Sequence, residues 1–151
     1  MLERRRGEYT ISTDRALLDL DLVHRFLSEE AYWSQGVERE VVERSIEHSL
    51  PFGLYRGREQ VGFARVVTDR AAIAYLADVF VISAERGYGL GKWLVETVLA
   101  HPDLQGLRVL FLGTADAHSL YERYGFRAID PTRMMERRTG SSDAANDQDP
   151  D

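Results

Sequence analysis

The feature that most constrains the fold is a strand–helix–strand step between residues 73 and 112. Residues 73–82 are rich in Ile, Val, Tyr and Phe, as strands are, and a glycine-rich segment at 86–92 follows them. A helical apolar stripe comes next, at Leu94, Val95, Val98 and Leu99. The apolar run 108–112 then predicts a strand buried on both faces. Because a helix connects the two strands, we expect them to be parallel neighbours in one sheet.

The remaining elements follow from the same periodicities. We expect further strands at 8–13, 52–56, 60–68 and 133–137, and further helices at 21–31, 38–48 and 115–124. A turn at 56–59 makes the middle strands an antiparallel meander, so the sheet should be mixed but mostly antiparallel. Asp21 is the expected N-cap of the first helix. The expected inward residues of the second helix are Val41, Val42, Ser45 and Ile46.

Composition excludes several classes of protein. The chain has no cysteine, which excludes disulfides, thiolate zinc sites and thiol nucleophiles, and we expect no metal. The formal net charge of −6 gives no broad basic face for nucleic acid. No apolar run is long enough to cross a membrane, and none follows Arg4–Arg6 to make a secretory signal, so we expect a cytoplasmic protein. We expect one domain at 1–138 and a disordered acidic tail at 139–151.

The glycine-rich segment between the strand and the helix predicts an anion site. Glycine allows close backbone approach, and the free N–H groups at a helix start, together with the helix dipole, favour phosphate. A Walker A loop would need glycine where Arg86 stands, and a dinucleotide fingerprint would need glycine at Lys92. Both nucleotide patterns therefore fail. A glycine turn that only reverses the chain stays as the structural alternative.

A third glycine pattern fits the segment, and a second motif accompanies it. The form Arg/Gln-x-x-Gly-x-Gly/Ala is matched by Arg86, Gly89 and Gly91. About 30 residues later, the segment 117–126 matches Ala-x-x-x-Tyr-x-x-x-Gly-Phe. In this order and context the chain resembles the GNAT superfamily of acetyl-CoA-dependent N-acetyltransferases, best over residues 60–130. The resemblance implies an α+β fold with three α/β/α layers around a mixed, mostly antiparallel central sheet of six to seven strands.

The resemblance also assigns residues to the coenzyme. The pyrophosphate of acetyl-CoA would bind mainly to backbone N–H groups of the loop, and the pantetheine arm would pair with the edge of the strand before it, where this strand splays from 108–112. The implied acetyl-CoA-binding residues are Val79, Phe80, Val81, Arg86, Gly87, Tyr88, Gly89, Leu90, Gly91, Lys92 and Tyr121. Charged contacts from Arg86 and Lys92 would add to the backbone donors.

Two side chains are candidates for the chemistry of amine acetylation. Asp78 is a carboxylate in an otherwise apolar strand and is the candidate base, acting through water; an ion pair with Arg65 is the equal structural alternative. Tyr121, which the resemblance places beside the cofactor sulfur, is the candidate acid, and a core aromatic is its alternative. A backbone N–H of Val79 or Phe80 is the candidate donor to the thioester carbonyl.

The predicted function is transfer of an acetyl group from acetyl-CoA to a primary amine of a small molecule or peptide, by direct attack. For the acceptor, Tyr32, Trp33 and Phe52 are candidate pocket walls together with Asp78, although such aromatics more often serve packing. The alternatives are a non-catalytic acyl-CoA-binding or sensing module on the same fold, and a nucleotide-binding protein. No nucleic-acid or membrane partner is expected, and the resemblance makes a homodimer a natural arrangement.

Overall fold

The computed structural model describes residues 1–139, which form two compact units, 1–113 and 114–139. Residues 140–151 of the predicted acidic tail lie outside the described part. The strands are β1 (Glu3–Arg6), β2 (Tyr9–Ser12), β3 (Leu50–Arg56), β4 (Glu59–Thr68), β5 (Ile73–Val81) and β6 (Val109–Leu112). The helices are α1 (Leu20–Arg25), α2 (Arg39–Glu47), α3 (Leu90–Leu99) and, in the second unit, α4 (His118–Glu122). The prediction of one domain at 1–138 stays a prediction.

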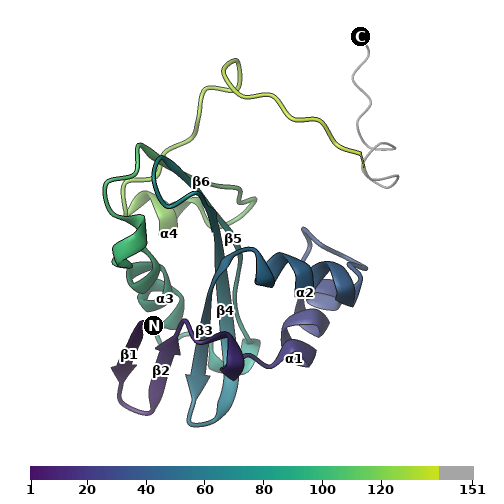
Figure 1. The fold of residues 1–151 in the computed structure, drawn as a ribbon, viewed down its shortest axis with the longest axis vertical. Coiled ribbons are helices and arrows are strands. Elements are labelled where there is room, and N and C mark those ends of the chain that lie inside the picture. Colours follow the sequence, from purple (N-terminus) through teal and green to yellow (C-terminus); the bar gives the residue numbers. More distant parts are fainter. Residues whose placement is uncertain (140–151) are drawn as a thin grey trace. The chain divides into compact units, whose positions relative to one another are not determined.

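The first unit is built on a single six-stranded sheet in the order β1-β2-β3-β4-β5-β6. Every neighbouring pair is antiparallel except β5 and β6, which run parallel from Ile73 opposite Val109 to Leu76 opposite Leu112. The parallel pair confirms the reading of the strand–helix–strand step, since α3 is the connection between them (Figure 1).

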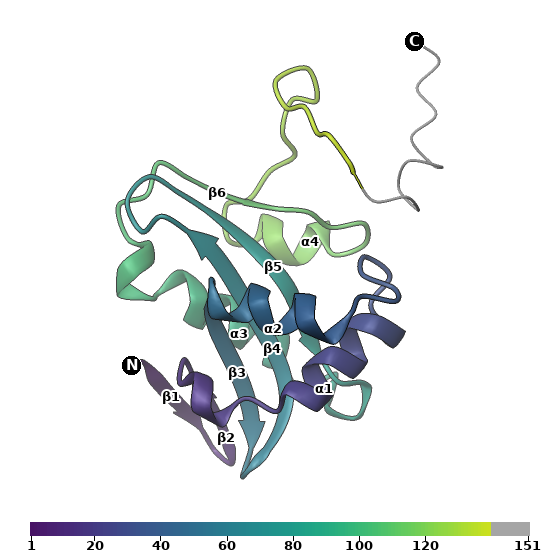
Figure 2. The ribbon, with the colours of Figure 1, turned by 45° about the vertical axis from the view of Figure 1, so that its right-hand side comes forward.

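The helices of the first unit cover both faces of the sheet. α1 and α2 lie on one face and α3 on the other, which gives the three layers predicted (Figures 1 and 2). On the first face the core is aromatic: Phe80 of β5 stacks on Phe26 with ring centroids 3.9 Å apart, and Phe63 of β4 lies beside it at 6.0 Å. Val23, Leu27, Ala31, Val42 and Ile46 complete this cluster. Residues 80 and 63 thus fix β5 against the two helices.

Two helix predictions need correction in detail. The N-cap of α1 is Asp19, whose carboxylate accepts from the N–H of Leu22, while Asp21 lies in the first turn and pairs with Arg39. The helix predicted at 21–31 begins one residue earlier, and its last five residues, Phe26–Glu30, form a π-helical turn. In α2 the buried stripe is narrower than predicted, because Val41 is 50% exposed and only Val42 and Ile46 are buried.

The predictions for the edges of the sheet were also incomplete. β1 was missed because Glu3–Arg6 is a charged, exposed edge strand with no apolar alternation. Every residue of β6 is partly exposed rather than buried on both faces, since β6 is the other edge. The strand predicted at 133–137 is wrong: among residues 114–139 no strand forms, and Met135 is 97% exposed.

His101, just after α3, should make stability fall in mild acid. Its ring is 8% exposed, packs edge-on against Phe52, and accepts from the N–H of Asp103 at Nδ1. Burial lowers the pKa of His101 below its ordinary value. Below about pH 6.5 the unfolded chain therefore takes up a proton that the folded chain resists, so stability is lost as pH falls through this window. Melting temperatures measured from pH 7.5 to 5 should show a slope that His101→Asn flattens; an unchanged slope would contradict this.

Candidate active site

The first element of the site is the part of β5 that extends beyond its parallel partner. Pairing between β5 and β6 ends at Leu76 opposite Leu112, yet β5 continues for five more residues, to Val81. Over residues 77–81 this edge of β5 has no β6 residue opposite it, as the predicted splay requires. On its other side the same segment pairs with β4, from Arg65 opposite Ala77 to Gly62 opposite Val81. The strand is therefore held on one side and leaves backbone groups for a ligand on the other.

A β-bulge sits where the extended part of β5 begins. Asp78 and Val79 together lie opposite the single residue Ala64, because the register shifts between the pairs of Phe63 and Arg65. Asp78 has a φ of 54°, in the left-handed region that few residues other than glycine adopt. The bulge changes the direction of the Asp78 side chain relative to a regular strand, and the backbone at Asp78 is locally strained as a result.

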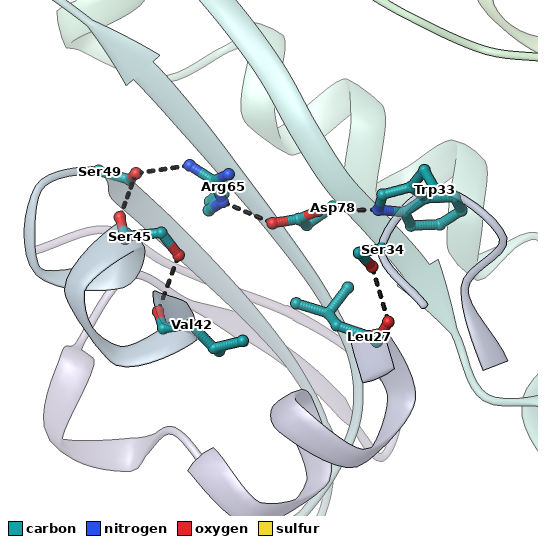
Figure 3. Close-up of polar contacts among 8 residues, drawn as sticks. All are labelled: Leu27, Trp33, Ser34, Val42, Ser45, Ser49, Arg65 and Asp78. Atoms are coloured by element: carbon teal, nitrogen blue, oxygen red, sulfur yellow. Dashed lines mark hydrogen bonds and ion pairs between the residues drawn. The ribbon is translucent and has the colours of Figure 1, made fainter. Parts of the chain in front are cut away.

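The carboxylate of Asp78 is held by two donors. Arg65 Nε donates to Oδ2 at 2.6 Å, and Trp33 Nε1 donates to Oδ1 at 2.8 Å (Figure 3). The side chain of Asp78 is 11% exposed and that of Arg65 is 19% exposed. The ion pair that the sequence left as an alternative is thus formed, and Trp33 joins it. No local pattern could have predicted the Trp33 contact, because the two residues lie 45 positions apart.

The glycine-rich loop presents a row of backbone donors. Gly87 and Gly89 adopt φ values of 93° and 75°, and Gly89 is the N-cap of α3. Within the described residues, no backbone N–H of residues 87–92 donates a hydrogen bond. A Cβ built on Gly87, Gly89 or Gly91 would meet nothing within 4 Å, so the space beside the loop is open. Such a run of N–H groups at a helix start suits a phosphate.

The side chains of the loop, unlike its backbone N–H groups, do not all face the open space beside it. Arg86 turns back, and its Nε donates to the carbonyl of Val81 at 3.0 Å, which ties the loop to the end of β5. Leu90 is buried and anchors the start of α3, whereas Tyr88 is 68% exposed and Lys92 is also exposed. Contacts of the pyrophosphate with Arg86, with Lys92 and with the backbone N–H groups of the loop therefore stay predictions.

A buried carboxylate just before the loop was missed by the sequence reading. Glu85 is 6% exposed, accepts from the hydroxyl of Tyr9 at 2.6 Å and pairs with Arg56 at 3.0 Å. The Tyr9 hydrogen bond lowers the pKa of Glu85, and Glu85 in turn raises the pKa of Tyr9. Tyr9 lies 76 positions away, so no local pattern could have found this partner. The three residues fix the chain two positions before the first glycine of the loop.

We expect Glu85→Gln and Tyr9→Phe to weaken acetyl-CoA binding while leaving kcat at saturation little changed. Each variant weakens the anchor formed by Tyr9, Glu85 and Arg56 by one hydrogen bond. The glycines that follow are conformationally flexible, so the loop depends on this anchor for its conformation. The dissociation constant should rise about threefold to tenfold, measured by calorimetry. Glu43→Gln is the matched control, because Glu43 pairs with Arg39 on the exposed face of α2. Equal affinity in all three variants would show that the anchor does not shape the loop.

The remaining candidates lie in different surroundings. Tyr32 and Trp33 are 54% and 45% exposed and meet edge to face, with centroids 5.0 Å apart. Phe52 is fully buried in the core beside His101, so its side chain does not join them as a pocket wall. Tyr121 lies in α4 of the second unit, is 8% exposed and packs edge-on against Phe126. Its position is described within that unit alone.

Among residues 1–139 no group of three or more His, Cys, Asp or Glu side chains could hold a metal ion. In the same part of the chain, no helix is long and apolar enough to cross a membrane.

Comparison with known proteins gives consistent matches. Residues 20–126 match the model of the acetyltransferase (GNAT) family. A Gibberella zeae protein whose name assigns it to the acetyltransferases is 31% identical over 145 residues, which cover 81% of each chain. A Xanthomonas campestris crystal structure described as a GNAT-family acetyltransferase is 49% identical, has a TM-score of 0.84, and the match covers 87% of this chain and 93% of that one. Glucosamine-6-phosphate N-acetyltransferase of Arabidopsis thaliana shares the fold, at 17% identity and a TM-score of 0.60, over 87% and 99% of the chains.

Proposed function

Because this chain belongs to the acetyltransferase (GNAT) family, we propose that it transfers an acetyl group from acetyl-CoA to a primary amine of a small molecule or peptide. The observation that carries the proposal is the row of unbonded N–H donors at residues 87–92. This row follows closely in sequence on the edge of β5 that extends past β6. Diphosphate needs such a row, and an amide-containing arm needs such an edge. A turn that only reversed the chain would need neither.

The residues present fit acetyl-CoA as a co-substrate. The backbone N–H groups from Gly87 to Lys92 would hold the pyrophosphate, with the N-terminal end of α3 behind them. The pantetheine arm would add to the edge formed by Asp78–Val81, as an extra strand pairs with a sheet. The open space beside the three loop glycines leaves room for this approach.

The chemistry is attack of a neutral amine on the thioester carbonyl. A C–N bond forms, the C–S bond breaks, the amine loses a proton and the departing thiolate gains one. We assign the oxyanion to a backbone N–H of Val79 or Phe80, and the proton for the thiolate to Tyr121. No covalent enzyme intermediate is required, and the chain has no cysteine to form one. For Asp78 the sequence left two roles open, a base acting through water and a partner of Arg65.

The test is to incubate the protein with acetyl-CoA and a panel of amines. The reaction is monitored through the free thiol released from the coenzyme and through the mass of the acetylated product. The panel should span arylalkylamines, polyamines, amino acids, a peptide N-terminus and glucosamine 6-phosphate. We expect thiol release to match the acetylated product for at least one amine, and acetyl-CoA but neither ATP nor NAD to raise the melting temperature. Acetyl-CoA binding without turnover of any amine would favour the non-catalytic acyl-CoA-binding module.

The cellular setting belongs to the same proposal. A cytoplasmic location and a homodimer are expected from the sequence and the resemblance. Light scattering during size-exclusion chromatography would measure the mass against the 17.2 kDa of one chain. A monomer would remove the dimer from the proposal and leave the chemistry as it stands.

A further inference from the structure

We infer that Asp78 is a positioning residue that holds Trp33 as a wall of the acceptor site, and that the acceptor carries an aromatic or other flat apolar group beside its amine. This inference rests on the proposed acetyl transfer and deepens it. The evidence is a hydrogen-bond network that joins four elements of the first unit: the end of α2, strand β4 through Arg65, the bulge in β5, and the loop at 31–37.

The network runs from the end of α2 through Arg65 and Asp78 to Trp33 (Figure 3). Ser49 donates to the carbonyl of Ser45, at the end of α2, and Arg65 NH1 donates to Ser49 Oγ at 3.1 Å. The same guanidinium donates through Nε to Asp78, which also accepts from Trp33. Arg65 and Trp33 therefore reach the two oxygens of one carboxylate from opposite sides.

This arrangement favours positioning over proton transfer for Asp78. Each carboxylate oxygen of Asp78 accepts a hydrogen bond, and the bond from Arg65 is charge-assisted. If the carboxylate moved to accept a proton from a substrate-bound water, one of these two bonds would weaken. The left-handed φ of Asp78 is a strained conformation that persists where surrounding contacts determine it. The bonds to Arg65 and Trp33 are such contacts. The bulge and the network together make Asp78 the point at which the loop at 31–37 is attached to β5.

Trp33 is fixed at its polar end and open at its apolar surface. The indole N–H is bonded, yet 45% of the residue is exposed, and Tyr32 stands at 89° to it and is 54% exposed. Ser34 Oγ donates to the carbonyl of Leu27 at 2.7 Å and ties the loop to the preceding helical turn, and Gln35 Nε2 donates to the carbonyl of Ala31 at 2.7 Å within the loop.

Two perpendicular rings held in this way form a rigid apolar corner beside the bulge. A flat apolar group can pack in the corner, and the faces of the rings also attract the ammonium form of an amine. The ring faces themselves carry no hydrogen-bond partner for a polyhydroxylated or polyamine chain. The ammonium contact is therefore open to any amine, and the apolar packing only to one with a flat apolar group.

The kinetic test compares 2-phenylethylamine with spermidine and glucosamine 6-phosphate, with the variants Trp33→Ala, Trp33→Phe, Asp78→Asn and the double variant. We expect the wild type to prefer 2-phenylethylamine, and Trp33→Ala to lower kcat/KM for it about tenfold or more, mainly through KM. Trp33→Phe and Asp78→Asn should give similar losses that do not add in the double variant. The single amide oxygen left by Asp78→Asn bonds to the cationic Arg65 and turns the NH2 group toward the Trp33 N–H, so both variants lose the same bond. Asp21→Asn is the matched control, an exposed carboxylate paired with Arg39.

The pH profile separates positioning from base catalysis. If Asp78 only positions Trp33, the Asp78→Asn variant should still show the rise of kcat/KM with increasing pH that the wild type shows. Loss of this rise with pH in Asp78→Asn would overturn the inference. So would a fall in kcat that occurs with every amine and adds to the effect of Trp33→Phe in the double variant. A wild type that prefers the two hydrophilic amines, with Trp33→Ala unaffected, would overturn the acceptor class while leaving acetyl transfer intact.

A binding measurement needs no turnover and so separates this inference from the proposed function. The chain has two tryptophans, so a Trp93→Phe background isolates the fluorescence of Trp33. Adding Asp78→Asn to this background should increase acrylamide quenching of Trp33, because the ring loses its attachment to β5. Unchanged quenching would show that Asp78 does not hold Trp33, whether or not any amine is acetylated.

Discussion

Replacing Tyr121 by phenylalanine should lower kcat about 100-fold or more, while the dissociation constant for acetyl-CoA changes little. The departing thiolate needs a proton, and the ordinary pKa values of a phenol and a thiol, about 10 and about 8.5, are close enough for transfer between them. The phenylalanine ring keeps the edge-on contact with Phe126, 5.8 Å between centroids, so α4 should retain its packing. The loss is then confined to the hydroxyl group. Steady-state kinetics at saturating acetyl-CoA, with calorimetry for binding, would measure the two effects.

Tyr124→Phe is the matched control for this variant. Tyr124 lies three residues after Tyr121, in the turn that follows α4, and also carries a hydroxyl, but the family motif gives it no catalytic role. Its turnover should stay close to that of the wild type. If Tyr121→Phe also turned over normally, the acid would be another group or water, and Tyr121 would be a core aromatic.

Gly89→Val should weaken acetyl-CoA binding by about tenfold to 100-fold. Gly89 has a φ of 75°, which a β-branched residue adopts only with strain, and it is the N-cap of α3. A valine there would either strain the loop or rotate the N–H groups of the following residues away from the pyrophosphate. Its side chain would also enter the open space beside the loop. Calorimetric titration with acetyl-CoA measures the change.

Gly57→Val separates this effect from general backbone strain. Gly57 lies in the turn between β3 and β4, has a φ of 61°, and likewise has nothing within 4 Å of a built Cβ. Both substitutions should lower the melting temperature by comparable amounts, but only Gly89→Val should lose affinity. Equal affinity in Gly89→Val and wild type would remove the pyrophosphate from the loop.

The parts of the fold that the sequence predicted depend on local patterns. The parallel pair of β5 and β6 follows from the change of apolar period around residues 86–92. The backbone conformation of Gly87 and Gly89 is likewise a local property of the residue type. Each of these can be read within a window of a few residues.

The parts that the sequence missed depend on distant partners or on context. Glu85 pairs with Tyr9 and Asp78 with Trp33, contacts that exist only after the sheet has assembled. β1 gains its place from pairing with β2 rather than from apolar residues of its own. The strand predicted at 133–137 had a suitable pattern, but a strand also needs a neighbour for its backbone groups, and in the described residues this segment has none.

The most direct test of the account is a crystal structure of the protein with CoA. We expect N–H groups of residues 87–92 to lie about 2.9 Å from pyrophosphate oxygens, and the pantetheine amides to pair with backbone groups of residues 77–81. CoA bound elsewhere, with the loop donors bonded inside the protein and β5 closed against β6 as far as Val81, would contradict it.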